Sequence, residues 1–222
     1  MDFTEDEYKE IAAQLRKPNG ELGEIVAEKM NEGNLLMNQN TIKALNISDS
    51  DSILEIGMGN GFFVKDILSL ADGLHYIGCD YSEDMVLLSQ KVNARFIDSG
   101  SARFFHRKAE ELPVGDSSID ILFTVNTLYF WEDHTAILSE FRRVLNQNGK
   151  LILSFRPAEV MELYPPTKYN FDYYSKEEAA DLLKEYGLEV LEVQEFEEPP
   201  IERDGQSFPP KHVILISGIS KT

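Results

Sequence analysis

Three glycines stand at alternate positions directly after an apolar run. The segment "ILEIGMGNG", residues 53–61, places Gly57, Gly59 and Gly61 behind a strand-like stretch. Glycine lets the backbone pass close to a ligand or adopt a positive φ. Where such a loop leads from a strand into a helix, free N–H groups and the positive end of the helix dipole converge on one point. The spacing predicts a binding loop, although a tight turn without a ligand would use glycines in the same way.

An acidic residue follows at the end of the next strand-like run. Asp80 lies 19 residues after Gly61, at the end of "LHYIGCD". A carboxylate at that point can accept two hydrogen bonds from a ribose diol, as in nucleotide-binding βαβ units. Ser82 already fills the helix-capping role that Asp80 could otherwise have. The loop and Asp80 together favour an adenosine-containing ligand.

The loop differs from the dinucleotide fingerprint G-x-G-x-x-G. It reads Glu55-x-Gly57-x-Gly59-x-Gly61, without the third glycine at the dinucleotide spacing. The acidic residue before it would repel a pyrophosphate but suits a ligand with a cationic amino-acid end. The spacing counts against a nucleotide-dependent reductase, which we keep as the alternative enzyme class.

Four segments in this order resemble the motifs of class I S-adenosylmethionine-dependent methyltransferases. They are "LEIGMGNG", "YIGCDYSEDMV", "AEELPVGDSSIDILFTVNTLYFW" and "EFRRVLNQNGKLIL", and the resemblance extends over most of residues 52–219. It implies S-adenosylmethionine as cofactor, S-adenosylhomocysteine as product and methyl transfer by in-line displacement. The leader "LRKPNGELGEIVAEKMNEGNLLMN" is similar to that of small-molecule methyltransferases of the ubiquinone/menaquinone-biosynthesis type.

The resemblance also implies a set of cofactor contacts. Asp80 would bind the ribose hydroxyls, Tyr81 would lie against the adenine, and Asn126 would stand at the cofactor edge. The full expected set is Glu55, Gly57, Met58, Gly59, Gly61, Asp80, Tyr81, Met85, Ala109, Glu110 and Asn126.

One position departs from the family pattern. Many relatives carry an aspartate before "AE", where this chain has Lys108. A lysine cannot accept a hydrogen bond from the adenine amine. Either Glu110 takes over that bond, or backbone groups around Ala109 and stacking hold the adenine.

Methyl transfer from a sulfonium depends on alignment and exclusion of water more than on acid–base chemistry. A general base is needed only if the acceptor is protonated at the working pH, and no catalytic dyad stands out. Tyr129 in "NTLYFW" is the one weak candidate, with simple packing as its alternative role. The same run lacks the Asn/Asp-Pro-Pro-aromatic signature of exocyclic-amine methylases, which disfavours methylation of DNA bases or of glutamine.

An irregular stretch, residues 156–174, interrupts the alternation of strands and helices. It contains four tyrosines and one phenylalanine. Insertions at the carboxyl edge of a parallel sheet often build substrate pockets, and a self-packed surface loop is the alternative. The expected substrate-pocket residues are Tyr129, Trp131, Tyr164, Tyr169 and Tyr173.

The elements around these residues predict an α/β fold. From Ser52 onward, short β-like runs alternate with amphipathic helix-length segments, which is typical of a parallel sheet with crossover helices. The link before the last strand contains no helix, which favours an antiparallel final strand. We expect a Rossmann-like three-layer sandwich with a seven-stranded sheet over residues 49–222, and a helical lid over residues 1–48, for which plain packing is the alternative. We also expect a helix over residues 60–71 and a left-handed cap at Gly149.

Composition limits the partners. The 222 residues carry a net charge of −18, which repels phosphate backbones, so we expect a small-molecule partner and no nucleic acid. No apolar run is long enough to span a bilayer, and the acidic start favours a cytoplasmic protein. Four histidines without metal-ligand spacing predict no metal site. The sequence does not identify the methyl acceptor. A module that binds the cofactor or a partner without catalysis is the alternative function.

Overall fold

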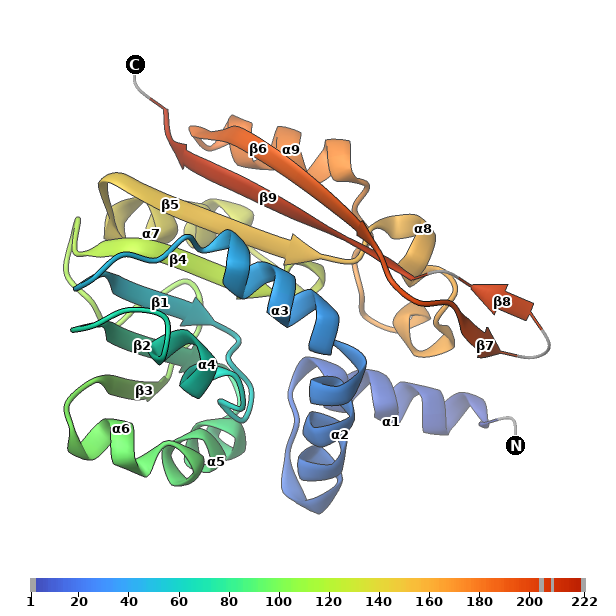
Figure 1. Cartoon of the computed structure of the whole chain (residues 1–222). Helices are drawn as coiled ribbons and strands as arrows, with labels where there is room; N and C mark the ends of the chain where they lie inside the picture. The colour runs from blue at the N-terminus through green and yellow to red at the C-terminus, as the bar shows by residue number, and fades with distance from the viewer. Residues whose placement is uncertain (1–2, 204–205, 209, 221–222) are drawn as a thin grey trace.

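A seven-stranded sheet forms the centre of the protein (Figure 1). The computed structural model describes residues 3–203, 206–208 and 210–220. The strand order is β3-β2-β1-β4-β5-β9-β6. Its strands are β1 (Ser52–Ile56), β2 (His75–Asp80), β3 (Ala102–His106), β4 (Ile119–Val125), β5 (Leu145–Phe155), β6 (Leu188–Glu197) and β9 (Lys211–Ile219). β9 pairs antiparallel with β5 and β6, and the other pairings are parallel, which confirms the expected fold class.

Helices cover both faces of the sheet and make it the middle of three layers. On one face, α7 (His134–Val144) and α9 (Lys176–Glu185) bury apolar side chains against the strands. On the other face, α3 (Leu35–Ala44), α4 (Val64–Leu68) and α5 (Glu83–Val92) do the same, and α6 (Ala94–Asp98) follows α5. Strands covered on both faces read as continuous apolar runs, which is why "ILEI" and "IDILFTV" are recognisable in the sequence.

Helix starts follow the capping pattern of the sequence. The Ser82 hydroxyl accepts a hydrogen bond from the Met85 N–H, and α5 begins directly after it. Ser175 and Glu178 form a reciprocal capping box at the start of α9. These side chains bind N–H groups that have no partner within the helix, and the capping role expected of Ser82 is confirmed.

The N-terminal helices divide between two places. α3 lies across the sheet, and its segment buries Met37, Ile42 and Leu45 in the core. α1 (Glu5–Arg16) and α2 (Gly20–Gly33) lie beyond the carboxyl ends of β1, β2 and β4 (Figure 1). Of the three N-terminal helices, α1 and α2 are therefore the two that lie beyond the carboxyl edge of the sheet.

Two local expectations are wrong. The helix expected over residues 60–71 is only α4, because the glycine loop continues as turns up to Phe63. Gly149 does not cap a helix: α7 ends at Val144 and Gly149 lies within β5. A Cβ at Gly149 would lie 2.9 Å from the Ile119 carbonyl oxygen, beside a register shift between β4 and β5. Close strand packing therefore explains this glycine.

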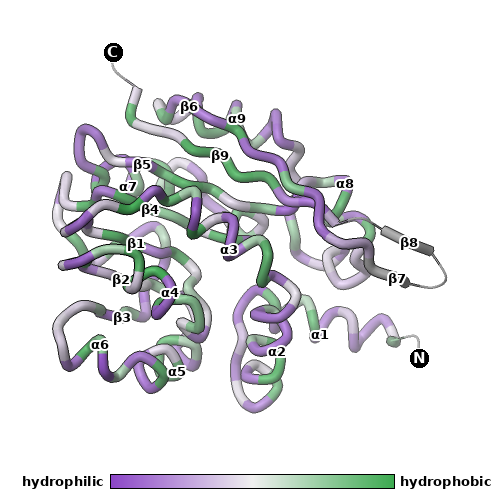
Figure 2. The backbone as a smooth tube through the Cα atoms, viewed as in Figure 1, coloured by the Kyte–Doolittle hydropathy of each residue, from purple (hydrophilic) through white to green (hydrophobic). Residues whose placement is uncertain are grey.

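The remaining elements lie in connections. η1 (Leu128–Phe130) follows β4, and α8 (Ala158–Met161) and η2 (Pro165–Lys168) lie in the irregular stretch. A hairpin of β7 (Ile201–Arg203) and β8 (Gln206–Phe208) lies in the link to β9. Figure 2 shows β9 as largely hydrophobic and β6, its neighbour at the sheet edge, as largely hydrophilic. Within the described part of the chain, no helix combines the length and apolarity needed to cross a membrane.

Candidate cofactor and acceptor site

A cavity of about 240 Å³ lies where the glycine loop, the ends of β2 and β4, and the N-terminal helices meet. In open α/β sheets, ligands bind outside the carboxyl ends of the strands. Most lining residues come from three sources: the end of β1 and the loop after it, the residues at and after the ends of β2, β3 and β4, and the N-terminal helices α1, α2 and α3. The cavity is the natural place to test the expected cofactor residues.

The three loop glycines have different tasks. All have positive φ, of 75° at Gly57, 57° at Gly59 and 68° at Gly61. A Cβ on Gly57 would lie 2.4 Å from Thr127 Cγ2, and one on Gly61 would lie 2.7 Å from Asn93 Nδ2. A Cβ on Gly59 would meet no atom within 4 Å. Gly57 and Gly61 therefore permit close packing, and Gly59 leaves open space beside the cavity that it lines.

Asp80 is held by backbone donors. Its Oδ2 accepts a hydrogen bond from the Gly59 N–H at 2.9 Å, and its Oδ1 accepts one from the Ser82 N–H at 2.8 Å. Burial raises the pKa of Asp80, although these two bonds act in the opposite direction. A carboxylate has about four lone-pair positions, so Asp80 keeps acceptor capacity for a diol in the cavity that it lines.

Glu55 is a buried carboxyl at the same place. It is 6% exposed, lines the cavity and accepts a hydrogen bond from the Tyr76 hydroxyl. Burial raises the pKa of Glu55 to about 7; the negative charge of Asp80 adds to this, and the Tyr76 bond opposes it. A cation beside it would restore the ionised form. The carboxyl pair and the open space at Gly59 thus fit a ligand that combines a ribose with an ammonium group.

The expected adenine side carries two cations. Tyr81 is 40% exposed, and the Lys17 and Lys108 ammonium groups lie 4.2 Å and 5.2 Å from its ring centroid. Lys108 therefore faces the ring that is expected to stack on adenine. The other expected cofactor residues that line the cavity here are Met58, Met85, Ala109 and Glu110.

Asn126 has a left-handed backbone at the end of β4. Its φ is 57°, and its N–H donates to the Ser154 carbonyl at 2.9 Å. Its Nδ2 donates to Asn34 Oδ1 at 3.1 Å, and its Oδ1 accepts from the Tyr129 hydroxyl at 2.9 Å. A non-glycine residue in this conformation costs free energy and needs such fixed partners.

Tyr129 supports the cavity from behind. It is 2% exposed and is not among the residues that line the cavity. Besides its bond to Asn126, its hydroxyl accepts from the Arg156 N–H at 2.5 Å. Burial raises the pKa of the Tyr129 phenol far above its usual value. With these contacts, Tyr129 is better suited to holding Asn126 in position than to taking a proton from an acceptor.

The expected substrate-pocket residues separate into two groups. Trp131 lines the cavity, and its Nε1 donates to Thr127 Oγ1 at 3.2 Å. Tyr164, Tyr169 and Tyr173 are not among the lining residues.

The irregular stretch instead supports the cavity wall. Phe171 packs at 4.6 Å between ring centroids against Phe130, which does line the cavity. Tyr169 lies against α1, with the Lys9 ammonium 5.7 Å from its ring centroid.

Polar contacts hold α1 and α2 over the cavity. Arg16 at the end of α1 forms an ion pair with Glu132, and the Pro18 carbonyl accepts from the Ser82 hydroxyl. On α2, Asn31 Nδ2 donates to Asn60 Oδ1 at 3.2 Å. The two helices are thus tied to the loop after β1, to α5 and to the segment after β4.

Several cavity residues escaped the sequence analysis, and three of them are asparagines. Asn31, Asn34 and Asn38 come from α2, its junction with α3, and α3, and all line the cavity. Their intervals of three and four residues match one face of a helix, which is the signal that could have identified them. Within the described residues, no group of three His, Cys, Asp or Glu side chains could hold a metal ion.

Comparisons with known proteins identify the family. A methyltransferase domain family model matches residues 54–153. The relative named uncharacterized methyltransferase YdaC, from Bacillus subtilis (strain 168), is 30% identical over 161 residues, which cover 72% of this chain and 84% of the relative.

Solved structures share the fold. A chain from the complex between the Haloferax volcanii Trm112 methyltransferase activator and a methyltransferase has a TM-score of 0.76 at 16% identity, covering 88% of this chain and 93% of that chain. A SAM-dependent methyltransferase from Aquifex aeolicus has a TM-score of 0.64 at 16% identity, covering 87% and 97%. These findings favour methyl transfer over the nucleotide-dependent reductase. The chain therefore belongs to the class I S-adenosylmethionine-dependent methyltransferases and is an enzyme of that family.

Proposed function

We propose that this enzyme methylates a small molecule inside the cavity beneath α1 and α2. The observation that carries the proposal is the enclosure: both helices line a cavity of about 240 Å³, and ion-pair and hydrogen-bond contacts tie them to the sheet domain. A duplex or a protein surface would have to displace both helices. The net charge of −18 further disfavours a nucleic acid acceptor.

The cofactor would bind along the glycine loop. Asp80 would accept hydrogen bonds from the ribose hydroxyls. Glu55 would face the ammonium end, because its buried carboxyl forms no ion pair with a basic side chain among the described residues. Gly59 supplies the space beside them. The adenine would lie on Tyr81, which already attracts the Lys108 ammonium.

The residues of this chain would act by placement. The bound cofactor supplies a methyl group on a sulfonium, which is reactive without help from an acid. Tyr129 and Asn34 hold the Asn126 side chain in place by hydrogen bonds. Asn126 would contact the acceptor and orient it toward the methyl group. α1 and α2 would exclude water while the two reactants are in line. The proposal involves no metal, since the described residues offer no ligand cluster.

Calorimetric titration with S-adenosylhomocysteine tests the cofactor site. We expect micromolar binding by the native protein and a loss of at least about tenfold, or about 1.4 kcal/mol, in Asp80→Ala. Asp98→Ala, an exposed acid on α6, is the matched control and should bind like the native protein. Equal binding by Asp80→Ala would refute the assigned site.

A screen with radiolabelled S-adenosylmethionine tests the acceptor class. Label transfer to a small molecule by the native protein is the expected result. Transfer only to proteins or nucleic acids, with small molecules unlabelled, would overturn the small-molecule assignment.

A further inference from the structure

We propose that the cavity binds an uncharged, hydrogen-bonding group of the acceptor, such as a carbonyl or a hydroxyl, through the side-chain amides of Asn31, Asn34, Asn38 and Asn126. We call these four residues the amide group. The inference rests on the proposed function, because it describes the acceptor side of the same cavity. It adds a substrate class: a neutral polar group on an apolar body.

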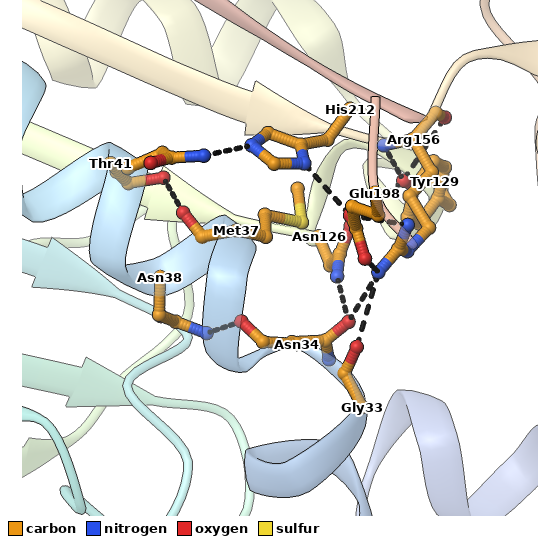
Figure 3. Close-up of polar contacts among 11 residues, drawn as sticks. Gly33, Asn34, Met37, Asn38, Thr41, Asn126, Tyr129, Arg156, Glu198 and His212 are labelled. Carbon is orange, nitrogen blue, oxygen red and sulfur yellow. Dashed lines mark hydrogen bonds and ion pairs between the residues drawn. The ribbon is translucent and has the colours of Figure 1, made fainter. Parts of the chain in front are cut away.

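The amide group lines one cavity from two sides. Asn31, Asn34 and Asn38 come from the α2–α3 region, and Asn126 comes from the end of β4. The Asn126–Asn34 bond joins the two sides (Figure 3). Among the described residues that line the cavity, no charged side chain bonds to any of the four.

Several atoms of the amide group keep free hydrogen-bonding capacity. Asn34 uses its Oδ1 for Asn126 and Arg156, and Asn38 uses its Nδ2 for the Asn34 carbonyl at 3.0 Å. Within residues 3–203, 206–208 and 210–220, no group bonds to Asn34 Nδ2 or to Asn38 Oδ1. Neither atom is fully buried, so a ligand or solvent can reach both. One free donor and one free acceptor are the requirements for binding a hydroxyl or a carbonyl.

A buried ion pair fixes Asn34, the central member of the amide group. Arg156 Nη2 donates to the Gly33 carbonyl at 3.2 Å and lies 3.5 Å from Asn34 Oδ1 (Figure 3). Its guanidinium binds both carboxylate oxygens of Glu198, at 2.8 Å and 3.2 Å, and His212 Nδ1 lies 2.8 Å from the same carboxylate. Amides held this firmly lose little further freedom when they bind an acceptor.

The same ion pair neutralises the cation that bonds to the amide group. The Arg156 and Glu198 side chains are each 9% exposed, and each neutralises the other. Among the described residues, the basic side chains that line the cavity, Arg16, Arg107 and Lys108, bond to none of the four amides. A charged acceptor group beside the amides would therefore have no counterion in direct contact, and such burial is costly. A neutral group pays no such cost.

The walls next to the amide group are apolar. Met30, Phe130 and Trp131 line the same cavity. Surfaces of this kind hold the hydrocarbon or aromatic part of a ligand, while a few polar groups set its orientation. The expected acceptor therefore combines an apolar body with an uncharged polar group.

The test uses matched probe pairs and the full chain loaded with S-adenosylhomocysteine. The members of each pair share one aromatic body and differ in a single polar group, neutral in one and charged in the other, for example methyl 4-hydroxybenzoate against 4-hydroxybenzoate, and 4-hydroxyphenethyl alcohol against tyramine. Affinity is measured by ligand-observed NMR titration. We expect the neutral members to bind about tenfold or more tightly than their charged partners.

An isosteric charge change supplies the decisive variant. Asn34→Asp keeps the oxygen that accepts from Asn126 and Arg156, and replaces only the free Nδ2 with an oxygen. We expect this variant to bind the neutral ester about fivefold or more weakly than the native protein does. Its affinity for tyramine should rise relative to its affinity for 4-hydroxyphenethyl alcohol, and its affinity for S-adenosylhomocysteine should not change. Asn148→Ala, an exposed asparagine of β5, is the control and should behave like the native protein.

The outcomes separate the two proposals. Failure to bind S-adenosylhomocysteine would refute the cofactor site, and the probe pairs are then titrated against the ligand-free full chain, where a preference for the charged members would still overturn the uncharged-acceptor inference. Normal cofactor-product binding with charged probes preferred, or with no neutral probe bound, would overturn the uncharged-acceptor inference. If Asn34→Asp bound every probe with the same affinity as the native protein, that result would also overturn the inference.

Discussion

At the scale of single residues, Glu55 links the cavity to pH. Its carboxyl has a pKa near 7, against an ordinary value of 4.5, because it is buried. Between those pH values the folded protein binds more protons than the unfolded chain, so the free energy of unfolding falls as pH rises. The full change is on the order of 3 kcal/mol, is present below about pH 4.5 and is lost above about pH 7.

Urea unfolding of the ligand-free protein at several pH values from 5 to 8 measures this effect. Glu55→Gln should show a clearly shallower fall than the native protein, because its side chain does not titrate. Asp80, whose pKa burial also raises, contributes in the same direction. The same pH slope in both proteins would show that Glu55 is not the titrating group.

Two loop glycines make a matched pair at the same scale. Gly57→Ala would place a Cβ 2.4 Å from Thr127 Cγ2 and strain a φ of 75°, so we expect a loss of about 2 kcal/mol or more in stability. Gly59→Ala meets only the strain of its φ of 57°, about 1 kcal/mol, but it fills space beside the cavity. We expect Gly59→Ala to lose about tenfold in affinity for S-adenosylhomocysteine.

Thermal unfolding and calorimetric titration of the two variants separate these effects. Gly57→Ala should have the lower melting temperature, and Gly59→Ala should have the larger loss of affinity relative to its loss of stability. The reverse order would mean that Gly59, rather than Gly57, is the packing glycine.

At the scale of elements, the N-terminal helices act as two units. α3 belongs to the core through Met37, Ile42 and Leu45, whereas α1 and α2 cover the cavity. We propose that the lid is residues 3–33, a shorter segment than the 1–48 expected from sequence. A chain that starts at Gly33 should fold and unfold cooperatively, with weaker S-adenosylhomocysteine binding.

A second truncation, starting at Asp49, is the comparison. It removes three core side chains worth about 1.5–3 kcal/mol each, which is comparable to the whole stability of a domain. We expect no cooperative unfolding from that chain by circular dichroism. A stable Asp49 chain, or an unfolded Gly33 chain, would contradict the division between α3 and the lid.

At the scale of the whole molecule, local patterns were readable and distant pairings were not. Strand-length apolar runs alternating with capped helices predicted the sheet, because each pattern is set by neighbours in sequence. Arg156, Glu198 and Gly33 meet from three distant segments, so no local pattern announces their contact. Gly149 followed the same rule: its place was decided by a carbonyl on β4, not by the helix before it.

The candidate site divides in the same way. The glycine loop and Asp80 were predicted because their chemistry is contained in one βαβ unit. The substrate-side tyrosines stay a prediction: Tyr164, Tyr169 and Tyr173 lie outside the lining of this cavity, which includes asparagines from α2 and α3. Which helix covers a sheet edge depends on long-range packing that composition does not encode.

The position of β9 has a consequence for the order in which the chain acquires its structure during synthesis. β9 lies between β5 and β6, so β6 has no neighbour in the sheet until residues 211–219 have left the ribosome. Until then β5 presents an open apolar edge, and Glu198 has no imidazole beside it. The nascent chain therefore carries an unfinished edge from the completion of β5 until β9 emerges, and β9 completes both the sheet and the ion-pair network behind the cavity.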